Sequence, residues 1–166
     1  TLADLPDALP DMPGPVSEWI RKVRSKNSAA LEKTADRLFA VSGARATVLP
    51  PDARHCDYNL IPLTIADGCL YKCRFCKVKN KKKFTERSGS DIRHQLQELK
   101  HLYGPDLINY NALFLGEHDA LNASKDLILF AAQQAHDTLG FEQSVMKQPR
   151  MFLFGSVDSL LNADMT

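Results

Sequence analysis

From Tyr58 onward, short apolar runs alternate with longer segments whose apolar residues recur every three or four positions. The apolar runs at 59–66, 112–115 and 151–154 are predicted to be strands. The segments 91–103 and 125–139 are predicted to be helices; Ser88 or Ser90 is expected to cap the first, and Gly140 follows the second. Strands that alternate with helices of this length are typical of an α/β fold with a parallel sheet.

The predicted strands also indicate where chemistry would gather. Pro62 has no N–H to give to a ladder, so the first strand is expected at a sheet edge. Parallel sheets place reactive residues at the carboxyl ends of their strands. Those ends lead into Ala66-Asp-Gly-Cys69, Leu115-Gly-Glu117 and Phe154-Gly-Ser156, and we expect these three segments to share one rim.

The pattern before residue 58 is helical. Residues 1–15 carry four prolines and are expected to be irregular. Ser17 is predicted to cap a helix that follows it, and a second helix is expected to end at Gly43. The apolar positions of the two helices are Trp19, Ile20 and Val23, then Leu31, Ala35, Leu38 and Phe39. We therefore divide the chain into a helical extension with a linker, 1–57, and an α/β region, 58–166.

Composition places the chain among ordinary globular proteins, with 44% hydrophobic and 25% charged residues. The formal net charge of +1 gives the chain as a whole no electrostatic reason to bind nucleic acid or an anionic membrane. No apolar run approaches the roughly 20 residues that cross a bilayer, and the first residues lack the basic and apolar regions of a secretory signal. We expect a cytoplasmic protein.

The chain has four cysteines, and three of them, Cys69, Cys73 and Cys76, fall within one short segment. This clustering does not suit a disulfide framework and favours thiolates that bind a metal in a reducing compartment. Thiolates prefer iron–sulfur clusters, zinc or Cu(I). Three thiolates on a four-iron cube leave one iron without a protein ligand, which is where chemistry would occur. A structural zinc is the alternative, and Cys56 as a fourth ligand would instead suit an electron-transfer protein.

The spacing Cys69-x3-Cys73-x2-Cys76 after a first strand, with Phe75 before the last cysteine, resembles the signature of the radical S-adenosylmethionine (SAM) superfamily. The resemblance implies that the three cysteines are the catalytic metal ligands of a [4Fe–4S] cluster whose open iron binds SAM. It also implies one-electron cleavage of SAM to a 5′-deoxyadenosyl radical, with a flavodoxin or ferredoxin as electron donor. Gly116-Glu117 resembles the family's Gly-Gly-Glu motif, with Leu115 in place of its first glycine.

The same resemblance implies a partial (β/α) TIM-like barrel, and we expect the N-terminal part of a longer enzyme because three of the family's six strands are recognisable. Phe75, Glu117 and Gly116 are expected to contact SAM, as are Tyr71 and Ser156. Simpler roles compete: Phe75 would only pack, and Glu117 would cap a helix or face solvent. His118, Asp119 and Asp158 lie near the same strand ends, where substrate would bind, although such residues most often face solvent.

Basic residues surround the cysteines. They are Lys72, Arg74, Lys77, Lys79, Lys81, Lys82, Lys83 and Arg87. Such residues contact phosphates in nucleic-acid-binding proteins, but Phe84 is the one aromatic candidate for stacking on bases. We favour a solvated loop whose charge offsets an anionic thiolate cluster. The sequence does not identify the substrate.

Overall fold

The computed structural model describes residues 14–42, 60–71, 74, 83–116, 119–146 and 148–163. The chain divides into two compact units, Thr1–Arg37 and Leu38–Thr166. The first unit contains α1 (Gly14–Arg24) and most of α2 (Ser28–Ser42), which continues into the second unit. All strands of the described residues belong to the second unit, which therefore carries the predicted α/β region.

The first helix begins earlier than the sequence pattern suggested, and the predicted cap at Ser17 is wrong. α1 starts at Gly14-Pro15, and proline suits a first turn because its φ is already helical and its missing N–H has no partner there. Ser17 lies inside the helix and donates its hydroxyl to the Gly14 carbonyl over 2.9 Å. At α2, the Asn27 side chain accepts from the Ala30 N–H at 2.9 Å. Gly43, the predicted stop of α2, lies outside the described residues.

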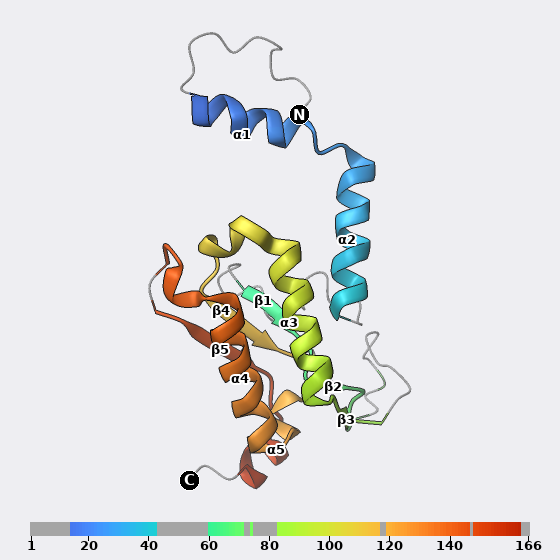
Figure 1. Ribbon diagram of the computed structural model, residues 1–166. Helices are drawn as coiled ribbons and strands as arrows, with labels where there is room; N and C mark the ends of the chain where they lie inside the picture. Colours follow the sequence, from blue (N-terminus) through green and yellow to red (C-terminus); the bar gives the residue numbers. More distant parts are fainter. Residues whose placement is uncertain are drawn as a thin grey trace. The chain divides into compact units, whose positions relative to one another are not determined.

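A parallel sheet of three strands organises the second unit (Figure 1). Its order is β1 (Leu60–Leu63), β4 (Ala112–Leu115), β5 (Arg150–Leu153). The prediction of a parallel α/β arrangement is confirmed, and β1 lies at an edge, as expected for the strand that contains Pro62. No closed barrel is found in the part of the chain that the structure describes.

The first predicted strand is divided in two, which corrects the expectation of one continuous strand. β1 ends at Leu63, and β2 (Ala66–Asp67) pairs antiparallel with β3 (Thr85–Glu86) in a separate sheet. Between them, the backbone N–H and carbonyl of Thr64 are both bonded by the side-chain amide of Gln95. Because a side chain satisfies this backbone, the segment leaves the sheet without burying unpaired polar groups.

Two helices, α3 (Gly89–Tyr103) and α4 (Lys125–Leu139), lie side by side on one face of the sheet (Figure 1). Of the two predicted caps of α3, Ser88 and not Ser90 is the N-cap, in a capping box with Asp91, and Gly140 ends α4 in the left-handed conformation. Four short helices complete the part of the fold that the structure describes. They are η3 (Gly104–Asn109), η4 (Ala120–Asn122), η5 (Phe141–Gln143) and α5 (Val157–Asn162).

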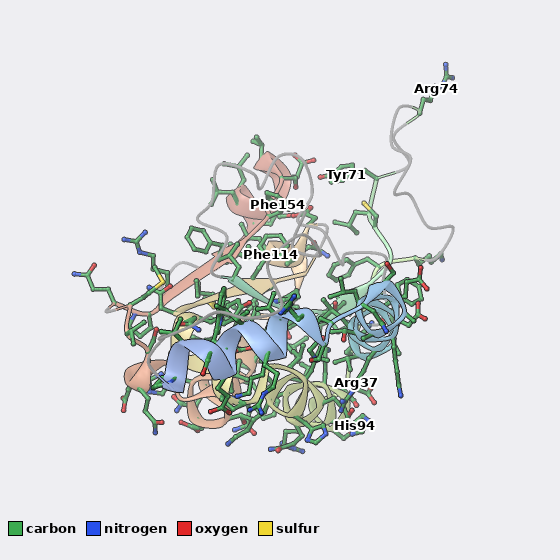
Figure 2. The ribbon with its side chains drawn as sticks, turned by 90° about the horizontal axis from the view of Figure 1, so that it is seen from above. Arg37, Tyr71, Arg74, His94, Phe114 and Phe154 are labelled. Carbon is green, nitrogen blue, oxygen red and sulfur yellow. The ribbon has the colours of Figure 1, made fainter. Side chains whose placement is uncertain are left out.

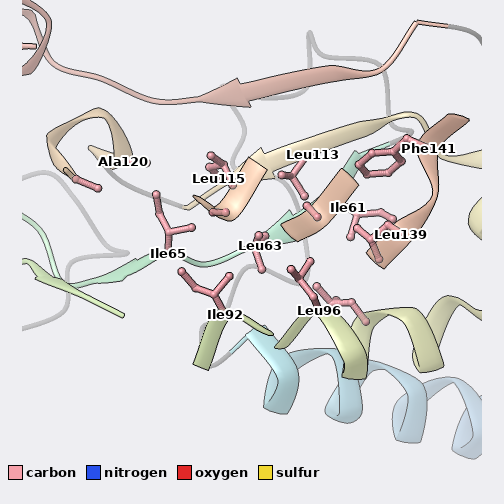
Figure 3. Close-up of a cluster of buried hydrophobic side chains, with 14 residues drawn as sticks. Ile61, Leu63, Ile65, Ile92, Leu96, Leu113, Leu115, Ala120, Leu139 and Phe141 are labelled. Atoms are coloured by element: carbon pink, nitrogen blue, oxygen red, sulfur yellow. The ribbon is translucent and has the colours of Figure 1, made fainter. Parts of the chain in front are cut away.

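The main core lies between the sheet and these helices (Figure 3). Ile61 and Leu63 of β1 and Leu113 and Leu115 of β4 point toward α3, where Leu96 is fully buried. The opposite face carries a smaller cluster of Leu60, Ala112 and Phe114 with Phe152 and Phe154. Phe114 and Phe154 meet edge to face, with ring centroids 5.3 Å apart (Figure 2). No helix of the described residues has both the length and the hydropathy to cross a membrane.

Candidate functional site at the carboxyl ends of the strands

The three strands of the parallel sheet end level with one another. Leu63, Leu115 and Leu153 are paired in register, so the turns that follow them leave from one edge, as predicted. Gly116 continues the ladder by donating its N–H to the Leu63 carbonyl over 2.9 Å. It has a φ of +77°, which favours glycine, and it is buried. A side chain here would also approach Ala120, so this strand end admits only a bare backbone.

The loop that carries the cysteines is closed at its base by β2 and β3. Arg87 forms a two-pronged ion pair with Asp67, with Nε–Oδ2 and Nη2–Oδ1 distances of 2.8 and 2.9 Å. The Arg87 N–H also donates to the Ile65 carbonyl at 2.8 Å. Paired guanidinium and carboxylate groups fix direction as well as distance. The two ends of the loop are therefore held together directly beside the strand ends.

A second contact ties the returning end of the loop to α4. Glu86 of β3 accepts the backbone N–H and the hydroxyl of Ser124, the N-cap residue directly before α4. A carboxylate at a helix N-terminus is favourable because the helix dipole is positive there. At the start of α3, hydrogen bonds from the Ser88 hydroxyl and N–H hold the pKa of Asp91 below its usual value. The residues after the loop thus lead into the capped start of α3 and contact the start of α4.

Cys69 is the one cysteine of the motif that the structure describes. It follows Gly68, whose φ is +82°, and its thiol is partly exposed at the rim. The Tyr71 N–H points to the Cys69 sulfur, with an N–S distance of 3.4 Å. Cys73, Cys76 and Phe75 lie outside the described residues, as do Cys56, Glu117 and His118. The described residues hold no group of three metal-binding side chains. An accessible thiol that receives an N–H bond fits a cluster ligand.

Tyr71 and Ser156, both predicted to contact the cofactor, are brought together by the fold. The Tyr71 hydroxyl lies 2.9 Å from the Ser156 hydroxyl oxygen and 3.1 Å from a carboxylate oxygen of Asp158. Figure 2 shows the Tyr71 side chain directed toward the part of the rim that contains α5. Tyr71 therefore links the segment after Cys69 to the turn that follows β5 and to α5.

Asp119 has a structural role that sequence reasoning did not identify. Its side chain is buried, and its two oxygens accept from the Ser156 N–H at 2.8 Å and from the Ser159 hydroxyl at 2.6 Å. The carboxylate is thus engaged by the protein, which does not favour the substrate contact considered for it. The Ser156-x-x-Ser159 spacing indicates a helix cap, but nothing local in the sequence reveals that Asp119 joins it.

Gly155 allows the turns after β4 and β5 to approach closely. A Cβ at Gly155 would lie 2.6 Å from a methyl carbon of Leu121. The Leu121 N–H donates to the Phe154 carbonyl at 3.0 Å, which joins the two turns through their backbones. The rim is therefore a continuous, hydrogen-bonded edge that runs from the cysteine loop to α5.

No protein-family model, curated protein or solved structure matches this chain.

Proposed function

We propose that this chain binds a [4Fe–4S] cluster through Cys69, Cys73 and Cys76 and acts as a radical SAM enzyme on a substrate that its sequence does not identify. The observation that carries the proposal is the position of the cysteine loop. It leaves from the carboxyl end of a parallel β/α unit, where the neighbouring strand ends in the buried, left-handed Gly116. Reactive groups gather at this edge in parallel α/β folds.

When bound, the cluster would give one electron to SAM and so produce methionine and a 5′-deoxyadenosyl radical that abstracts hydrogen from a substrate. The residues of this chain would bind and orient. The Asp67–Arg87 ion pair holds the loop ends together, and Gly116, in a left-handed conformation, turns the chain closely at the neighbouring strand end. Leu115, which stands where the family motif has glycine, is fully buried against the helices and takes no part in this contact.

Further contacts with SAM are proposed for Phe75 and Glu117, on the sequence resemblance alone. A flavodoxin or a ferredoxin is the proposed electron donor. Such a donor would have to match the reduction potential of the cluster, which depends on its thiolate ligands and on the hydrogen bonds to their sulfurs.

The test is anaerobic reconstitution with iron and sulfide, followed by metal analysis and EPR with and without SAM. We expect close to four irons and four sulfides per chain, as the cubic cluster requires. The EPR signal of the reduced cluster should change when SAM is added, because SAM would bind the iron that lacks a protein ligand. Cys69→Ala, Cys73→Ala and Cys76→Ala should each lose most of the iron.

Cys56→Ala is the matched control, since it removes a thiol outside the motif. Under the proposal it retains the cluster and the response to SAM. Loss of the cluster in this variant, together with no effect of SAM on the EPR signal of the wild-type protein, would instead support a four-cysteine electron-transfer protein. A colourless protein with one tightly bound zinc would refute the proposal and leave a structural metal site.

A further inference from the structure

A chain of hydrogen bonds joins Tyr71 to the buried Asp119 across the rim. The Tyr71 hydroxyl contacts Ser156 at 2.9 Å, the Ser156 hydroxyl contacts that of Ser159 at 2.9 Å, and Ser159 contacts Asp119 at 2.6 Å. Asp158 adds a second acceptor for the Tyr71 hydroxyl at 3.1 Å. These hydrogen bonds connect Tyr71 of the cysteine loop to the turns after β4 and β5.

The number of protons available fixes which group donates in each of these hydrogen bonds. An ionised carboxylate only accepts, so the Ser159 hydroxyl must donate to Asp119. The one proton of Ser159 is then used, and Ser156 must donate its own proton to Ser159. The Ser156 oxygen also accepts the Ser159 N–H at 3.0 Å, which leaves it one further lone pair for the Tyr71 hydroxyl. Tyr71 is therefore the donor at the outer end of these hydrogen bonds, and its single proton is shared between Ser156 and Asp158.

Tyr71 also contacts Cys69. While its hydroxyl bonds to Ser156 after β5, its backbone N–H donates to the sulfur of Cys69. We propose that Tyr71 is a positioning residue for the Cys69 sulfur, fixed through its hydroxyl by Ser156 and Asp158. In the cluster-bound protein, an inference that rests on the proposed function, its N–H would stabilise the added negative charge of the reduced cluster and so raise the reduction potential.

Tyr71→Phe tests this directly, because it removes the hydroxyl and keeps both the ring and the backbone N–H. In the metal-free protein, the amide at position 71 should exchange with solvent about tenfold faster, measured residue by residue by NMR, since losing a hydrogen bond of ordinary net strength shifts an equilibrium by about that factor. Tyr110→Phe is the matched control, since Tyr110 packs against Tyr103 away from the rim, and it should leave this exchange rate unchanged.

In the reconstituted protein, Tyr71→Phe should shift the midpoint potential of the cluster to a more negative value, determined by an EPR-monitored redox titration. The sign is informative. Loss of the N–H to sulfur bond destabilises the reduced state, whereas entry of water alone would stabilise it and move the potential upward. An unchanged or more positive potential would overturn the assigned role of the Tyr71 N–H.

Asp158→Ala provides a second variant, at an exposed side chain. Alone it should speed exchange at position 71, and in the Tyr71→Phe background it should add nothing, because both changes remove the same contact. Additive effects, or unchanged exchange in both single variants, would overturn the inference. Absence of any cluster in the wild-type protein would refute the proposed function instead, while the exchange data would still decide whether Tyr71 is held by its hydroxyl.

Discussion

The side-chain amide of Gln95 makes two hydrogen bonds with the backbone of Thr64, accepting its N–H at 2.8 Å and donating to its carbonyl at 3.0 Å. Both residues are buried. The amide thereby replaces a strand neighbour at the point where the chain leaves β1 and turns toward the cysteine loop. A helix residue thus determines where the first strand ends.

Gln95→Leu should destabilise the second unit by roughly 3 kcal/mol. The substitution keeps the side-chain volume but leaves a buried N–H and a buried carbonyl without partners, and each such group costs about 1–3 kcal/mol. Urea denaturation followed by circular dichroism measures the change. Gln97→Leu, an exposed position on the same helix, is the control and should be nearly neutral. Equal stabilities of the two variants would contradict the role of Gln95.

The Asp67–Arg87 pair should show a coupling energy of about 1 kcal/mol in a double-mutant cycle of Asp67→Ala and Arg87→Ala. Its geometry is two-pronged and the Arg87 side chain is only 15% exposed, so solvent screens it less than a surface pair. The exposed ion pair Lys22–Glu18, treated in the same way, should give a smaller coupling. If the two couplings are the same, the ion pair does not close the loop.

Gly155→Ala should destabilise the rim by about 1–3 kcal/mol, the usual cost of forcing additional atoms into a packed site. The added Cβ would lie 2.6 Å from one side-chain carbon of Leu121 and 2.9 Å from its Cβ, so the turns after β4 and β5 would have to separate. Thermal unfolding gives the loss. Gly14→Ala serves for comparison because no atom lies within 4 Å of its added Cβ. A neutral Gly155→Ala variant would show that the two turns separate at little cost.

Alkaline stability should depend on Tyr103. Burial raises the pKa of Tyr103 to about 12, from an ordinary value of 10. The folded state therefore holds this proton more tightly, and the contribution to stability is complete below pH 10 and is lost as pH rises toward 12. At pH 11 the loss is about 1 kcal/mol. Tyr103→Phe should remove this pH-dependent loss. The urea midpoint of the variant should therefore fall less between pH 8 and pH 11 than that of the wild type. Parallel pH profiles would contradict this assignment.

Local patterns in the sequence were sufficient for much of the fold. The strand 112–115 and the helix 125–139 were predicted with the bounds that the structure has, and Ser88, one of the two candidate caps of the preceding helix, is its cap. These features depend on side-chain periodicity and on hydrogen bonds between residues three or four positions apart. The shared rim followed as well, because parallel strands joined by helices must end on the same side.

Contacts between distant segments were decided only by the tertiary structure. The break at Thr64 depends on Gln95, 31 residues further along the chain, and the position of Tyr71 depends on Ser156, 85 residues away. The early start of α1 is a local exception, where Pro15 competes with the apparent cap at Ser17. The sequence by itself determined the main strands and helices of the parallel sheet and the end of the sheet near which Cys69 lies. Which polar groups meet there was decided by packing, because a hydrogen bond between remote residues forms only after the core has brought their segments together.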